Sequence, residues 1–146
     1  MKRTALSIIF LIAALVLVVR PGLAVELVVD NGAPGTSTVG AWCVSGAPGS
    51  YGPSSLYNCG GSSQDVYRWT PALATSGRYD VYLWWTTYPT RETDALFRIT
   101  EQGGAVTLKT VDQKVNGGQW NHIGSYTFGP AGPFTGGYVE ALGLNG

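Results

Sequence analysis

The stretch Gly77–Trp85, GRYDVYLWW, decides how the rest of the chain is expected to fold. Side chains of an extended strand alternate between its two faces. One face of this strand carries Tyr79, Val81, Leu83 and Trp85, and the other carries Asp80, Tyr82 and Trp84. Because both faces carry large side chains, we predict a central strand. One face should lie in a core, and the other under a partner layer or along a groove.

The first 24 residues have the pattern of a secretory signal peptide. Two basic residues precede an uncharged run over positions 5–19, and the run is followed by Arg20-Pro21 and the small residues of Gly22-Leu23-Ala24. A membrane-spanning helix needs roughly 20 apolar residues, more than this run supplies. We therefore predict cleavage after Ala24, an exported protein at the cell surface or outside the cell, and no membrane contact of the mature chain.

Removing residues 1–24 from the 146 leaves 122, which is enough for one domain with one core, over 25–146. The full chain has nine basic and nine acidic residues, but three of the basic ones lie in the signal segment. The mature chain then has six basic and nine acidic residues, a net charge of −3. This excess of acid argues against nucleic acid and anionic membranes as partners.

Cys43 and Cys59 are the two cysteines of the chain. An even number of cysteines in an exported protein favours a disulfide, and the Gly-, Pro- and Ser-rich loop between them has little else to hold it. A metal site would need further Cys or His nearby, and a catalytic thiol would need a His partner. We predict that Cys43 and Cys59 form a disulfide.

Strand-like runs recur along the mature chain and are separated by Gly, Pro, Asn or Ser. No mature segment shows the long apolar period of an amphipathic helix. With 21 Gly and 8 Pro, the composition favours an all-β fold, an antiparallel β-sandwich. The expected strands are Val25–Asp30, Gln64–Trp69, Arg78–Trp85, Ala95–Thr100, Ala105–Asp112, Gln119–Phe128 and Gly137–Leu142.

The turn Asn116-Gly117-Gly118 separates two of these runs. Asn-Gly supplies the positive φ angles of a tight hairpin, so we predict that the strands on either side pair antiparallel. In the second strand, Trp120 and Ile123 are three positions apart and would lie on opposite faces of a regular strand. A bulge near Gly124 would bring both into the core, because glycine accepts an extra strand residue most easily.

The segment TVDQKVNGGQWNHIGSYTF resembles the signature of the golvesin C-terminal-like domain, also called the xanthan-lyase-type carbohydrate-binding-like domain. VVDNGAPGTSTVGAW, YRWTP, SGRYDVYLWW and TRETDALFRI follow the same family order. The resemblance implies a jelly-roll or galactose-binding-like sandwich. It also implies a non-catalytic accessory module of exported bacterial proteins, found beside polysaccharide lyases, amidases and adhesive domains. It brings no ligand site at the level of residues.

The residues themselves also argue against an enzyme. The mature chain has no GxSxG string for a hydrolytic serine. Glu92 and Asp94 have the spacing of a carboxylate pair, but such pairs on loops are more often a solvated charged face. His122 is the one histidine and has no metal-binding companions. We predict no catalytic residues, no metal and no cofactor.

A binding role would use aromatic side chains that the core cannot absorb, because sugar rings stack on Trp and Tyr while polar groups bind the hydroxyls. The candidate ligand-binding residues are Tyr82, Trp84, Tyr88, Arg91 and Asp94, with Tyr51 and Tyr57 further out on the disulfide loop. Trp84 has a second interpretation as a core residue. The expected ligand is an extracellular or cell-wall polysaccharide.

Two further expectations stay open at this point. The competing function is a structural or adhesive module of a cell-surface protein that binds protein rather than glycan. Members of the resembled family also end with one more apolar strand after the segment matching positions 136–146. The resemblance therefore implies that this sandwich lacks its final strand, and that further domains of a longer protein follow it.

Overall fold

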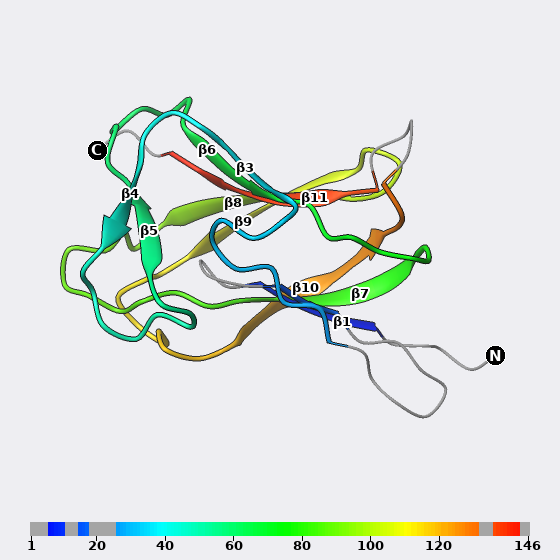
Figure 1. Ribbon diagram of the computed structural model, residues 1–146, viewed down its shortest axis with the longest axis horizontal. Helices are drawn as coiled ribbons and strands as arrows, with labels where there is room; N and C mark the ends of the chain where they lie inside the picture. Colours follow the sequence, from blue (N-terminus) through cyan, green and yellow to red (C-terminus); the bar gives the residue numbers. More distant parts are fainter. Residues whose placement is uncertain (1–5, 11–14, 18–25, 132–135, 144–146) are drawn as a thin grey trace.

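The computed structural model describes residues 6–10, 15–17, 26–131 and 136–143, and its strands form two facing sheets with a smaller third sheet beside them (Figure 1). The five-stranded sheet has the order β3-β6-β11-β8-β9, and the four-stranded sheet has the order β10-β7-β1-β2. A hairpin of β4 and β5 forms the third sheet. The predicted all-β sandwich is confirmed.

The strands of the larger sheet are β3 (Thr36–Val39), β6 (Val66–Trp69), β8 (Ala95–Thr100), β9 (Val106–Val111) and β11 (Tyr138–Leu142). The four-stranded sheet contains β1 (Leu6–Phe10), β2 (Leu15–Leu17), β7 (Gly77–Leu83) and β10 (Asn121–Phe128). The hairpin strands are β4 (Trp42–Ser45) and β5 (Ser55–Asn58). No helix among the described residues is long and apolar enough to cross a membrane.

The core lies between the two large sheets. On β7, Tyr79, Val81 and Leu83 are fully buried, as their shared face predicts. The facing sheet contributes Ile99 and Val139, which are equally buried. Because β7 has a strand on each side in its sheet, the prediction that Gly77–Trp85 contains a central strand is confirmed.

The predicted strand at Val25–Asp30 is wrong for its described part, since residues 26–30 belong to no strand. Val29 is nevertheless buried in the core, 4% exposed. The segment therefore packs through a side chain without joining a ladder. The chain turns directly after this segment, where Ala33 N donates to Asp30 O at 3.1 Å.

The hairpin predicted at Asn116-Gly117 is also wrong. β9 pairs with β8 in the five-stranded sheet, whereas β10 pairs with β7 in the other sheet. Asn116 does have the expected positive φ, 55°. Two hydrogen bonds tie the turn to the segment that follows β7. Gly117 N donates to Thr87 Oγ1 at 2.8 Å, and Gly118 N donates to Trp85 O at 2.8 Å. The turn thus carries the chain from one sheet to the other.

The predicted bulge is confirmed. The pairing of β10 with β7 shifts register between His122 and Gly124, and Gly124 has a φ of 145°. Both Trp120 and Ile123 are partly buried and pack against the core, which is the outcome the bulge was expected to produce.

Two strands fall inside the segment expected to be a signal peptide. β1 pairs parallel with β7, and β2 pairs antiparallel with β1. The expected cleavage position after Ala24 lies outside the described residues. Cleavage therefore stays a prediction, as does the missing final strand, since residues 144–146 also lie outside the described part.

Candidate functional site

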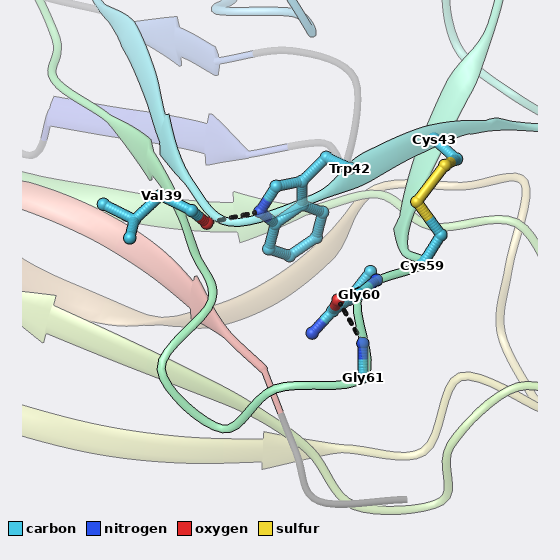
Figure 2. Close-up of a disulfide and its surroundings, with 7 residues drawn as sticks. Val39, Trp42, Cys43, Cys59, Gly60 and Gly61 are labelled. Atoms are coloured by element: carbon cyan, nitrogen blue, oxygen red, sulfur yellow. Dashed lines mark hydrogen bonds between the residues drawn. A yellow bond between two sulfur atoms is a disulfide. The ribbon is translucent and has the colours of Figure 1, made fainter.

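The disulfide hairpin forms one wall of the candidate site. Cys43 on β4 is bonded to Cys59 just after β5, with a Cα–Cα distance of 5.7 Å, so the predicted disulfide is confirmed (Figure 2). Trp42 Nε1 donates to Val39 O at 3.1 Å, and Asn58 Oδ1 accepts from Gly61 N at 3.1 Å. Both bonds lie at the open end of the hairpin, where Trp42 pairs with Asn58.

The opposite wall is the loop over residues 86–94, which follows β7. Arg91 N donates to Tyr88 O at 3.0 Å, which closes a tight turn within the loop. Gln113 N donates to Glu92 O at 2.9 Å and ties the loop to the segment after β9. The loop is therefore braced by a distant part of the chain as well as by its own turn.

Between these walls lies a cleft of about 770 Å³, within the size range of small-ligand sites. Its inner end is formed by the core residues Trp85, Phe97 and Ala141. The hairpin contributes Trp42, Ser45, Tyr57 and Asn58, and the loop contributes Thr86, Tyr88, Arg91 and Glu92. The cleft thus combines aromatic rings with several hydrogen-bonding side chains.

Arg91 joins the two walls. Its Nη2 donates to Ser45 Oγ of the hairpin at 2.6 Å and to Thr86 Oγ1 at 2.9 Å. Partial burial lowers the pKa of Arg91, and the neighbouring Tyr57 raises it. A guanidinium stays charged throughout the ordinary pH range, so the cleft contains a fixed, partly desolvated cation.

Tyr57 and Tyr88 are the exposed aromatic side chains of the cleft, with exposed fractions of 42% and 48%. They belong to opposite walls, the hairpin and the loop. Trp42 is half-buried and packs edge-on against Tyr67, with 5.5 Å between ring centroids. The two tyrosines therefore keep ring surface available for a ligand, while the Trp42 ring is fixed by its contact with Tyr67.

Tyr82 and Trp84, two of the predicted binding residues, do not line this cleft. They lie on the face of the β7 strand and its extension that points away from the core. Tyr82 packs on His122 at 4.8 Å between centroids. His122 Nε2 lies 3.5 Å from Asp80 Oδ1, and Asp80 also accepts from Ser125 Oγ.

Trp84 belongs to an aromatic cluster of Tyr51, Trp84 and Trp120. The three rings contact one another at centroid distances of 5.4–5.7 Å, and Trp84 Nε1 donates to Gly49 O at 2.7 Å. Each pair of rings in the cluster is tilted or edge-on, the preferred arrangement of aromatic pairs. The rings mainly cover one another and anchor the loop that carries Tyr51.

Asp30 lies against the same loop. A Cβ atom on Gly52 would collide with Asp30 Oδ2, so the carboxyl group closely approaches the loop backbone. Burial raises the pKa of Asp30 to about 6, although the bond from Asn31 N to Asp30 Oδ1, at 2.6 Å, lowers it.

The structure therefore separates the five predicted site residues into three places. Tyr88 and Arg91 meet in the cleft, Tyr82 and Trp84 lie on the outer face of the four-stranded sheet, and Asp94 is exposed and does not line the cleft. Sequence reasoning did not assign Tyr57 to the same site as Tyr88. The signal available for it was the disulfide, which fixes the loop carrying Tyr57.

The fold and the cleft define a disulfide-bonded β-sandwich domain with an aromatic-lined cleft. Residues 27–133 match the family model described as "Golvesin C-terminal domain". The chain belongs to this family, and the resemblance seen in the sequence is confirmed.

Two relatives give the same result. The chain is 35% identical over 107 residues to the xanthan lyase of Bacillus sp. strain GL1, covering 70% of this chain and 11% of that protein. It also resembles the 2.6 Å structure of Paenibacillus xanthan lyase, with a TM-score of 0.67 and 25% identity. That match covers 83% of this chain and 12% of the other. The chain therefore spans about a tenth of the length of each relative.

Proposed function

We propose that this chain is an exported, non-catalytic module that binds polysaccharide in the cleft between the disulfide hairpin and the loop over residues 86–94. The observation that carries the proposal is the pair of exposed tyrosines, Tyr57 and Tyr88, on opposite walls of a cleft that also holds Arg91. Sugar rings stack on such aromatic faces while charged and amide groups bind their oxygen atoms.

The relatives support a polysaccharide context, because both are named for xanthan. Export is supported by the signal-like pattern of residues 1–24 and by the Cys43–Cys59 disulfide, since disulfides persist in oxidising compartments. Each relative is much longer than this chain, so the lyase reaction named for them is not transferred to it.

The proposed lack of catalysis is supported by the side chains around the cleft. Glu92 is the single carboxylate among the described lining residues, whereas glycoside hydrolysis ordinarily uses two. Incubating the purified chain with xanthan and measuring new reducing ends and ultraviolet absorbance of unsaturated sugars checks this directly. Sustained product formation above a boiled control would contradict the proposal.

Binding is tested by affinity electrophoresis against a panel of bacterial polysaccharides that includes xanthan, followed by titration calorimetry for those that bind. Tyr57→Ala and Tyr88→Ala should each weaken binding by roughly threefold to tenfold, which is the range of one aromatic contact. Tyr51→Ala is the matched control, because Tyr51 is 47% exposed and lies outside the cleft. Equal losses for all three variants, or no binding by the wild type, would refute the cleft as a glycan site.

One observation favours a second candidate, an adhesive module that binds protein. Val106 and Leu108 of the edge strand β9 are 57% and 59% exposed, and two apolar side chains beside a free strand edge invite pairing with another chain. Leu108→Lys should abolish concentration-dependent self-association in light scattering if this edge is used. An entirely monomeric wild type would remove this support.

A further inference from the structure

Three arginines of the described chain have partly buried side chains, namely Arg68, Arg91 and Arg98. Two of them share one carboxylate. Arg68 Nη2 lies 2.7 Å from Glu140 Oε1, and Arg98 Nε lies 2.6 Å from Glu140 Oε2, while Glu140 itself is fully buried. Each of these two guanidinium groups therefore has an anionic partner within the protein.

Arg91 differs from these two because its protein partners are neutral. The ion pairs among the described residues involve Glu140 and Asp80, and none includes Arg91. Its two hydrogen bonds go to the hydroxyls of Ser45 and Thr86, and both come from Nη2. The Nη1 and Nε donors of Arg91 make no hydrogen bond within the described chain. Neither is among the buried polar atoms that lack a partner, so both are accessible to solvent.

A partly desolvated guanidinium without a counter-ion is a natural partner for an anion. Arginine presents planar N–H groups that match the geometry of a carboxylate, and such charge-assisted bonds are about twice as strong as neutral ones. The two hydroxyl bonds fix the orientation of Arg91, which reduces the entropy lost on binding. Tyr57 and Tyr88 lie in the same cleft and supply the ring surface beside the charge.

From this geometry we infer that the cleft selects acidic polysaccharides, and that Arg91 binds a carboxylate group of the sugar chain. The inference rests on the proposed function and narrows it to one class of glycan. The charged lining residues of the cleft are Arg91 and Glu92. Glu92 is exposed, so its repulsion of an incoming carboxylate is weakened by water and salt, whereas the partly buried Arg91 is screened less.

The inference is tested first on the ligand. Each polysaccharide of the panel, xanthan included, is titrated against the wild-type chain in its native form and after chemical reduction of its carboxylates to alcohols. The inference predicts that the polymers that bind contain carboxylates, and that reduction weakens binding about tenfold to a hundredfold, the range of a charged hydrogen bond. No change in the protein is needed, so folding does not enter the result.

Three variants then assign the effect to residues. Arg91→Gln should remove most of the difference between native and reduced polymers, and Arg91→Lys should restore part of it. Glu92→Gln should strengthen binding of the native polymer relative to the reduced polymer by about twofold to threefold, by removing a screened like charge. Far-ultraviolet circular dichroism and the melting temperature show which variants are folded.

The possible outcomes separate the two proposals. If polymers bind and carboxyl reduction leaves their affinity unchanged, the acidic specificity is overturned while the glycan-binding function stands. If reduction weakens binding but Arg91→Gln retains the full difference, the role of Arg91 is overturned. If no polymer binds in either form, both proposals are refuted.

Discussion

The two aromatic regions of this domain contain similar side chains but are built in different ways. In the cleft, Tyr57 and Tyr88 stand on separate walls and face a cavity with an arginine in it. In the aromatic cluster, Trp84 packs edge-on against Tyr51 and Trp120 and donates a hydrogen bond to the backbone. Partial exposure of aromatic rings therefore does not identify a binding site. The proposed site differs from the cluster in having a cavity, and an arginine without an ionic partner, beside the rings.

The largest expected effect concerns the wall of the cleft. Cys43→Ser with Cys59→Ser opens a disulfide between residues 16 positions apart, which should lower the free energy of unfolding by about 3 kcal/mol in the chain-entropy model. Glycan binding should fall strongly, because Tyr57 and Ser45 belong to the released hairpin. Denaturant titration and calorimetry measure the two quantities. Unchanged binding in the double variant would mean that the hairpin is not a wall of the site.

In the aromatic cluster, a substitution should lower stability without changing glycan binding. Trp84→Ala removes a half-buried ring and the bond to Gly49 O, so we expect a loss of about 2 kcal/mol in stability, below the range for fully buried aromatics. Binding by the folded fraction should be unchanged. Urea denaturation followed by titration at 15 °C separates the two effects. A folded Trp84→Ala protein with at least tenfold weaker binding would place the cluster in the site.

A smaller effect should appear with pH. Because the folded pKa of Asp30 is raised to about 6, the folded state holds a proton that the unfolded state releases near pH 4. The contribution of Asp30 to the free energy of unfolding is therefore fully present below pH 4 and is lost as the pH rises through 6. The loss should be about 1 kcal/mol, reduced from the full shift because the carboxyl is partly solvated.

Asp30→Asn is the control for this prediction. The variant should show a flatter dependence of the unfolding free energy between pH 4 and pH 7. Glycan affinity should show no change attributable to Asp30, because Asp30 lies against the loop of the aromatic cluster and does not line the cleft. If the slope is the same in the variant, another group is responsible.

The smallest effects on stability should come from the exposed tyrosines of the cleft. Tyr57 and Tyr88 are each more than two-fifths exposed, so alanine at either position should change stability by less than about 0.5 kcal/mol. Thermal melts of the two variants check this. A loss above about 2 kcal/mol for Tyr88→Ala would show that the ring supports the loop. Weaker glycan binding by this variant could then result from a disturbed loop and would not identify Tyr88 as a ligand contact.

Much of the fold was accessible from sequence because it depends on local alternation. The β8 strand has the predicted bounds, Ala95–Thr100, and the inward face of β7 is the one that its period of two predicts. The bulge near Gly124 followed from the parity of Trp120 and Ile123 together with the glycine itself. Such features are encoded within a few residues of where they occur.

The wrong predictions occur where the structure depends on contacts between residues that are distant in the sequence. Asn116-Gly117 encodes a turn with positive φ, but contacts with Trp85 and Thr87 determine that it joins two sheets instead of closing a hairpin. The site shows the same limit. Tyr88 and Arg91 share a loop and could be predicted together, whereas Tyr57 reaches them only through the disulfide hairpin.

The most direct test of the cleft uses the tryptophan indole N–H signals of the labelled protein. Trp42 lines the cleft, while Trp84 and Trp120 belong to the aromatic cluster. A soluble oligosaccharide prepared from a polymer that binds is added, and proton–nitrogen correlation spectra are recorded to saturation. The account predicts that the Trp42 indole signal moves and that those of Trp84 and Trp120 stay in place. Movement of the Trp84 and Trp120 signals with Trp42 unaffected would contradict it.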